Sequence, residues 1–78
     1  MTVTAYVLIQ TEVGRAEKVA TAARKIAGVV ASDNVAGPYD VIVKAESSSL
    51  DDLGKLVVSE IQKVEGITRT FTCPIVNL

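Results

Sequence analysis

Apolar residues in this chain follow two different periods, and the two periods alternate along the sequence in a repeated order. A period of two indicates a strand with one buried face, and a period near 3.6 indicates an amphipathic helix. The order is strand, helix, strand, strand, helix, strand, and the segments are residues 3–10, 15–27, 29–35, 40–46, 50–64 and 67–76. Two strand–helix–strand units of this length fit one domain, residues 1–78, and leave no room for a second.

Glycines and small polar residues mark the ends of the predicted helices. Gly28 and Gly66 follow the two helical segments, and glycine adopts the left-handed conformation common after a helix C-terminus without steric cost. The serines at 47–49 supply a helix cap, and Asp51 and Asp52 place negative charge at the positive end of the helix dipole. The second helix is expected to bury one apolar stripe, formed by Leu50, Leu53, Leu56, Val57, Ile61 and Val64.

The element order βαββαβ predicts an α+β fold, the ferredoxin-like sandwich, with a four-stranded antiparallel sheet in the order 4-1-3-2 and two helices on one face. This order places the first and third strands at the centre, which agrees with the apolar residues on both of their sides. The more polar segment 29–35 suits an edge. Because two helices cover only one face, either Tyr6, Leu8 and Ile42 or, if the two faces are interchanged, their alternates are expected on an exposed face. We expect two such sheets to pack together in a dimer.

The composition excludes several classes of function. Eight basic residues balance nine acidic ones, for a net charge of −1, so no positive field attracts a nucleic-acid backbone. The chain has no histidine and a single cysteine, Cys73, which argues against an internal disulfide, a metal site and histidine-assisted catalysis; we expect no cofactor. No apolar stretch approaches a membrane span and the N-terminus lacks the features of a signal peptide, so we expect a cytoplasmic protein without a membrane partner.

Few groups of side chains suggest chemistry. Cys73 has no histidine to activate it and is expected to act as a small apolar strand residue. Asp51 and Asp52 point about 100° apart on a helix, so capping explains them better than metal binding. The turn at 37–40, Gly-Pro-Tyr-Asp, is the exception. Two interpretations of it stay open, namely a tight hairpin turn with a packed tyrosine and a binding site.

Two segments together resemble the signature regions of the Lrp/AsnC family of transcription regulators. The segment 35–43, Val-Ala-Gly-Pro-Tyr-Asp-Val-Ile-Val, is similar to the glycine, aromatic and aspartate turn that precedes an apolar strand in that family. The segment 66–75, Gly-Ile-Thr-Arg-Thr-Phe-Thr-Cys-Pro-Ile, is similar to its glycine and threonine pattern. The resemblance covers essentially the whole chain and concerns the effector-binding (RAM) domain of the family.

Full-length members of the family carry an N-terminal helix-turn-helix domain, whereas here the first strand follows Met1 almost at once. The resemblance therefore implies a stand-alone effector-binding domain that does not bind DNA directly. It also implies homodimers, their assembly into rings such as octamers or decamers, and binding of an amino acid or related metabolite between dimers. Regulation of transcription is then expected to be indirect, by co-assembly with full-length Lrp/AsnC regulators.

The effector site of the family can be carried over position by position onto this sequence. The matching ligand-binding residues are Gly37, Tyr39, Asp40, Thr70, Thr72, Cys73 and Pro74. An amino acid presents a cationic amine, which Asp40 is expected to meet, and an anionic carboxylate, which backbone amides near Gly37 are expected to meet. Threonine hydroxyls both donate and accept hydrogen bonds.

The leading interpretation is thus a non-enzymatic module for metabolite sensing and assembly. The alternative is a small cofactor-free enzyme of the dimeric ferredoxin-like α/β-barrel type. Two tyrosines, one phenylalanine and no histidine provide little from which to build such an active site. A domain that only oligomerises, without a ligand, is the third interpretation.

Overall fold

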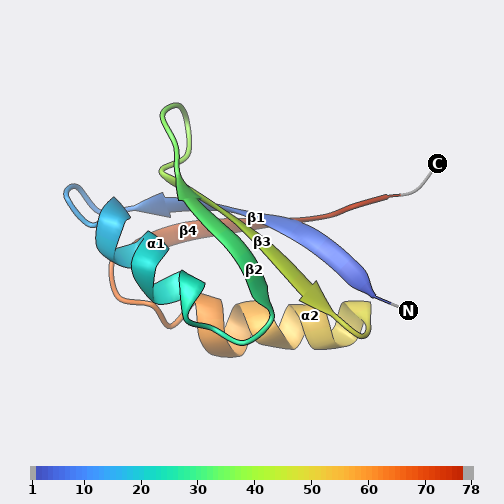
Figure 1. Ribbon diagram of the computed structural model, residues 1–78. Helices are drawn as coiled ribbons and strands as arrows, with labels where there is room; N and C mark the ends of the chain where they lie inside the picture. The colour runs from blue at the N-terminus through green and yellow to red at the C-terminus, as the bar shows by residue number, and fades with distance from the viewer. Residues whose placement is uncertain (1, 77–78) are drawn as a thin grey trace.

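Both helices of the molecule lie against the same side of a single four-stranded sheet (Figure 1). This computed structural model describes residues 2–76. In chain order its elements are β1 (Val3–Thr11), α1 (Ala16–Arg24), β2 (Val29–Asn34), β3 (Val41–Ser47), α2 (Leu50–Leu56), η1 (Val57–Ile61) and β4 (Ile67–Pro74). The segment η1 is a π-helical continuation of α2, so the two form one helical rod.

The strands lie in the order β2-β3-β1-β4, and every neighbouring pair is antiparallel. Read from the other edge, this is the order 4-1-3-2, so the predicted ferredoxin-like fold is confirmed. Alternate residues of the two central strands meet one stripe of each helix in the core. The buried apolar side chains are Ala5, Val7, Ile9, Val19, Ala20, Ala23, Val41, Val43, Ala45, Leu53, Val57 and Ile61.

The first helix ends at Arg24, three residues before the end that the apolar spacing predicts. Gly28 follows with φ +98°, as expected for the glycine after a helix. A Cβ atom at this position would lie 2.9 Å from Cδ2 of Leu56 and 3.2 Å from the carbonyl oxygen of Glu46. The Gly28 carbonyl accepts from the Glu46 N–H at 2.7 Å. A glycine is therefore needed here both for the backbone conformation and for the close approach to β3.

The second helix begins where the sequence predicts, because the Ser49 side chain accepts a hydrogen bond from the Asp52 N–H at 3.1 Å. The prediction that Leu50 belongs to its buried stripe is wrong, since this side chain is 59% exposed. The buried residues of the rod are four apart, at Leu53, Val57 and Ile61, and this spacing extrapolates back to position 49 rather than 50. No helix among residues 2–76 is long and apolar enough to cross a membrane.

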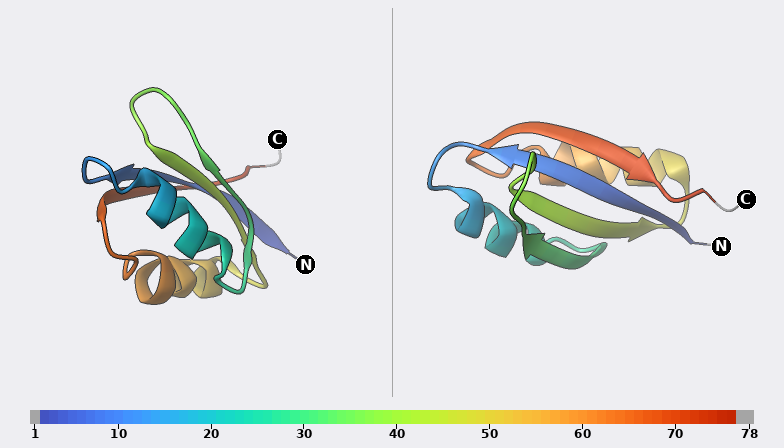
Figure 2. Two further views of the ribbon diagram at one scale, coloured as in Figure 1. Left: turned by 60° about the vertical axis from the view of Figure 1, so that its left-hand side comes forward. Right: turned by 90° about the horizontal axis from the view of Figure 1, so that it is seen from above.

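The face of the sheet opposite the helices is open (Figure 2). Phe71, Leu8 and Ile42 form one row across this face, because they are register partners on β4, β1 and β3. Tyr6 lies beside the row; it is 42% exposed and Phe71 is 37% exposed. The alternation along β1 and β3 thus places apolar side chains on both faces, and the predicted position of Tyr6, Leu8 and Ile42 on the uncovered face is confirmed.

Candidate functional site

The loop between β2 and β3 rises on the side of the sheet away from both helices (Figures 1 and 2). It contains the predicted turn at 37–40. At its base the Val35 N–H donates to the Asp40 carbonyl at 3.0 Å. Gly37 has φ +139°, a conformation that other residues rarely adopt, and the space around it is open. The shape of the loop therefore requires a glycine at this position, and no packing neighbour imposes it.

The Asp40 carboxylate ties this loop to the end of β1. Its Oδ2 atom accepts from the Thr11 N–H at 2.8 Å and from the Thr11 hydroxyl at 3.3 Å. The Asp40 N–H donates to the Ile9 carbonyl at 2.9 Å. The two segments are 29 residues apart in the sequence, so no local pattern points to this contact. This geometry fits the interpretation of 37–40 as a hairpin turn. The Asp40 side chain also lies at the base of the loop, so the interpretation as a binding site stays open.

Tyr39 packs on the open face rather than into the core. Its ring lies edge-on to that of Phe71, with 5.8 Å between centroids and 68° between planes. The guanidinium carbon of Arg69 lies 5.1 Å from the centroid of the Phe71 ring, which is a cation–π arrangement. Gln10 Nε2 donates to the Pro38 carbonyl at 3.2 Å and completes the support of the loop. Arg69 and Phe71 were not among the predicted site residues, although the period of two along β4 places both on one face.

Thr70 and Thr72 point in the opposite direction. They are the register partners of Ile9 and Val7, whose side chains are buried between the sheet and the helices. Directly paired residues share a face of the sheet, so both threonines lie on the helix side. The hydroxyl of Thr70 accepts from Nε2 of Gln62 at 3.0 Å, which joins β4 to the residue that caps η1.

Cys73 and Pro74 lie on opposite faces of the sheet. Cys73, an exposed free thiol, lies opposite Tyr6 on the open face, and Pro74 lies opposite the buried Ala5 on the helix side. The structure therefore brings the loop residues close to the open-face residues of β4 and places the two threonines and the proline on the far side of the sheet. Within one copy of the described chain, the predicted site residues do not surround a single small ligand.

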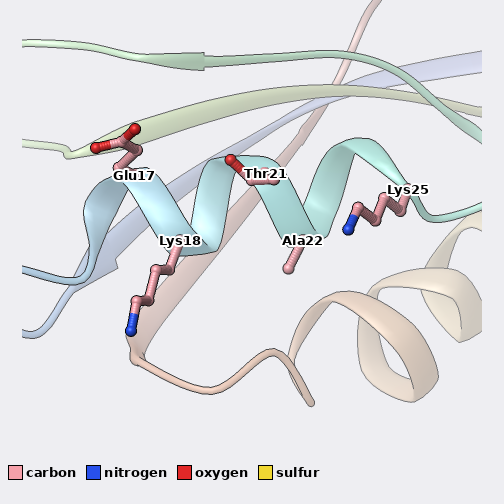
Figure 3. A pocket seen from close by; sticks show the side chains of 5 residues that line it. All are labelled: Glu17, Lys18, Thr21, Ala22 and Lys25. Carbon is pink, nitrogen blue, oxygen red and sulfur yellow. The ribbon is translucent and has the colours of Figure 1, made fainter.

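Two depressions on the described part of the surface can be compared with the predicted site. One, of about 310 Å³, is lined by Gln62, Ile67, Thr68, Arg69 and Thr70, and it shares only Thr70 with the predicted site. The other, of about 450 Å³, is lined by Glu17, Lys18, Thr21, Ala22 and Lys25 (Figure 3). All five of the latter residues belong to α1 and its C-cap, so no second element encloses a ligand there. Residues 2–76 contain no cluster of three or more potential metal ligands.

The sheet, its two helices and the loop at 37–40 together define a small α+β domain with one apolar face that is uncovered within one copy. The family model described as the Lrp/AsnC ligand binding domain matches residues 4–77. The chain belongs to this family, as its resemblance to the signature segments predicts. The family model describes a ligand binding domain and the relative PF0250 is an HTH-type transcriptional regulator, so the chain belongs to a family of regulatory domains and not to the enzymes of the alternative interpretation.

Relatives and solved structures agree with this assignment. An uncharacterised HTH-type transcriptional regulator of Pyrococcus furiosus, PF0250, is 33% identical over 72 residues, covering 88% of this chain and 48% of that protein. The chain thus spans about half the length of this relative. The crystal structure of TTHA0845 from Thermus thermophilus matches with a TM-score of 0.90 at 28% identity, covering 97% of this chain and 95% of that one.

A second similar structure is that of a protein with a bound ligand. The transcriptional regulator NMB0573 from Neisseria meningitidis, solved as a complex with L-Met, matches with a TM-score of 0.83. The match covers 96% of this chain and 50% of that one at 14% identity. At this level of identity the likeness concerns the fold.

Proposed function

We propose that this chain is a cytoplasmic module for metabolite sensing and assembly. It binds an amino acid or a related metabolite, forms homodimers that join into rings, and modulates transcription indirectly by co-assembly with full-length Lrp/AsnC regulators. Membership of the ligand binding domain family supports the first part. The last part is supported by the relative PF0250, an HTH-type regulator about twice as long as this chain. About half of that regulator matches this chain, so both proteins contain the domain through which we propose that they co-assemble.

The open face of the sheet supports the homodimer. The row Phe71, Leu8 and Ile42 with the adjacent Tyr6 presents apolar area that has no cover within one copy. Burying such area against a second, identical face removes it from water at a gain of about 25 cal/mol per Å². A two-fold contact uses the same patch on both copies, so a single exposed face suffices.

The single observation that carries the ligand proposal is the division of the predicted site residues between two sides of the sheet. The loop lies on the open side, and Thr70 and Thr72 lie on the helix side. A ligand that contacts both sets must lie where one copy's loop meets another copy's β4. The proposed site is therefore at a junction between dimers, where assembly and binding depend on each other.

The chemistry of the loop suits a zwitterionic ligand such as an amino acid, the class of molecule bound to NMB0573. Both hydrogen bonds from Thr11 use Oδ2 of Asp40, which leaves Oδ1 for the amine of a ligand. Backbone N–H groups near Gly37 can meet the carboxylate, although Pro38 supplies none. Threonine hydroxyls and the thiol of Cys73 then border the rest of the ligand.

A thermal-shift screen of amino acids, followed by calorimetric titration, tests the proposal. A ligand that binds only the folded state raises the melting temperature. If Asp40 pairs with the amine, Asp40→Asn weakens binding by about 1–3 kcal/mol. Thr11→Val is the matched control, because it loosens the same contact at Oδ2 without changing the charge. Equal affinities in all three folded proteins would remove Asp40 from the site, and a screen without any ligand would contradict the sensing function.

The proposal that the chain does not bind DNA itself has a separate test. The net charge is −1, and both helices of the described region pack on the sheet. We expect no retardation of duplex DNA at physiological salt by the purified protein, and retardation only when a full-length regulator is added. A shift with the purified chain alone that resists salt would contradict this.

A further inference from the structure

The depression of about 310 Å³ lies between the end of η1 and β4, and it is the one that includes a residue of the predicted site. It is lined by Gln62, Ile67, Thr68, Arg69 and Thr70. Unlike the depression on α1, it is formed by two separate elements, and its volume lies at the lower end of the range of small-molecule sites. The polar groups that line it therefore determine what it can bind.

Gln62 reaches this depression from the end of a π-helical turn. Its backbone N–H donates to the carbonyl of Val57, five residues earlier, at 2.8 Å. Single turns of this kind within helices occur frequently at functional sites. The Gln62 side chain extends toward β4, where Nε2 donates to the Thr70 hydroxyl oxygen at 3.0 Å. One hydrogen bond thus joins the wall that comes from the helical rod to the wall that comes from the strand.

The bond between Gln62 and Thr70 leaves hydrogen-bonding capacity on both partners. A side-chain amide has two N–H donors and a carbonyl acceptor, and a hydroxyl both donates and accepts. Among residues 2–76 no other hydrogen bond uses these two side chains, so Oε1 of Gln62 remains as an acceptor and the Thr70 O–H as a donor. The opposite orientation of the amide gives the same balance, because the Thr70 hydroxyl then donates to Gln62 and keeps its own acceptor capacity.

The hydrogen-bonding groups that remain at the depression are uncharged. The Thr68 hydroxyl donates to the Gln10 carbonyl at 3.1 Å, so its oxygen is left as a further acceptor. Arg69 also lines the depression, but its guanidinium carbon lies 5.1 Å from the centroid of the Phe71 ring, on the open face. The positive charge of Arg69 is therefore directed toward the other side of the sheet.

We propose that this depression binds the side chain of the ligand and that it selects a carboxamide, the group that ends glutamine and asparagine. The inference rests on the proposed function, in which the Asp40 loop of one copy holds the ligand amine and carboxylate and β4 of another copy meets the rest. A carboxamide donates to Oε1 of Gln62 and accepts from the Thr70 hydroxyl, so every group has a partner. The pair of Gln62 and Thr70 then determines which class of amino acid binds.

Other classes of side chain leave one of these groups without a partner. A methionine side chain has no strong donor or acceptor, and covering a polar group without satisfying it costs free energy. A carboxylate has no donor for Oε1 of Gln62, and an ammonium group has no acceptor for the Thr70 hydroxyl. A site that forms hydrogen bonds with one polar group rejects an analogue without that group more strongly than an apolar pocket rejects an extra methylene.

Calorimetric titration with matched amino acids tests the selection. Glutamine is compared with glutamate, methionine and lysine, and asparagine with aspartate and leucine, since all of them share the amine and carboxylate. We expect one of the two carboxamides to bind at least about tenfold more tightly than its analogues. Gln62→Leu should reduce this preference to less than about threefold and leave the affinity for the apolar analogue unchanged. Lys63→Ala is the matched control, because Lys63 is an exposed neighbour that does not line the depression.

The outcomes separate this inference from the proposed function. Amino acids that bind without a preference for a carboxamide, or a preference that persists in a folded Gln62→Leu variant, would overturn the selection and leave the proposed sensing function in place. Titrations in which no amino acid binds would overturn both. If Gln62→Leu does not fold, Thr70→Val replaces it and should lose the preference, whereas Thr70→Ser keeps the hydroxyl and should retain it.

Discussion

The two faces of the sheet are built from the same strands, yet their side chains differ in kind. On the helix side, β1 and β3 carry only alanine, valine and isoleucine at the central positions, and each is fully buried. On the open side the same strands carry Tyr6, Leu8, Ile42 and Lys44, which are half-buried or exposed. Small aliphatic residues fit a closed core, whereas aromatic and long side chains reach across a gap to a second surface. The helix side therefore holds the domain together, and the difference supports the proposal that the open side is a contact surface.

The largest difference is expected from the same substitution made on each face. Leu53→Ala removes a fully buried side chain and should lower the free energy of unfolding by about 2–5 kcal/mol. Leu8→Ala on the open face should cost on the order of 1 kcal/mol when the protein is dilute, because little packing is lost within one copy. Urea unfolding at low and high protein concentration measures both. Equal losses for the two variants in dilute solution would contradict the assignment of the faces.

A glycine pair gives the next largest difference. Gly28→Ala forces an unfavourable φ and brings a Cβ to 2.9 Å from Leu56 and 3.2 Å from the Glu46 carbonyl, so we expect a loss of roughly 2–3 kcal/mol. Gly37→Ala in the loop also forces an unfavourable positive φ, but the added Cβ would meet no atom within 4 Å. This substitution should therefore lower the free energy of unfolding by only roughly 1–2 kcal/mol. Thermal unfolding of both variants checks the order. A larger loss at Gly37 would mean that the loop is packed more tightly than the described contacts indicate.

A smaller effect is expected at the start of α2, which helps to form the covered face. Ser49→Ala removes the acceptor for the Asp52 N–H and should lower stability by about 1 kcal/mol, with no effect on assembly. Ser49→Asn keeps an acceptor oxygen at this position and should restore most of the loss. A change in the number of copies per assembly in either variant would show that this helix end takes part in the subunit contact, which would contradict the separate roles of the two faces.

The smallest effect concerns pH. Hydrogen bonds from Ser48 and Ser49 hold the pKa of the Asp52 carboxyl below its ordinary value of 3.8. A carboxyl whose pKa is lower in the folded state stabilises the fold above its unfolded-state pKa, and this contribution is lost as the pH falls through the folded pKa. The stability difference between the natural chain and Asp52→Asn should therefore be constant near neutral pH and narrow below pH 3.8. A difference that grows in acid would contradict the assigned contacts.

The regular parts of this fold were predictable because they depend on local periods. The order of the elements predicts the strand order, the alternation in β1 and β3 agrees with it, and Ser49 predicts the start of α2 through one hydrogen bond. Gly28 predicts the left-handed turn after α1, although the helix itself ends earlier, at Arg24. The exposure of Leu50 was not predictable in this way, because it depends on how the rod lies on the sheet.

The candidate site was less predictable than the fold because it depends on contacts between distant segments. Asp40 bonds to Thr11 across 29 residues, and Phe71 contacts Tyr39 from the last strand. The resemblance to a family supplies the residue types at the right positions, including Thr70 and Thr72. It does not say that these threonines and the loop lie on opposite sides of the sheet, since the direction follows from the register with β1.

Sedimentation equilibrium of the natural chain and of Leu8→Asp tests the central claim, that the open face is an assembly surface. Leu8 lies in the middle of the apolar row, so a carboxylate there opposes burial of the face against a second copy without entering the core. The account predicts a dimer or a multiple of dimers for the natural chain at micromolar concentration, and a smaller, folded species for Leu8→Asp. A natural chain that stays monomeric would contradict it. So would a folded Leu8→Asp variant that forms an assembly with the same number of copies as the natural chain.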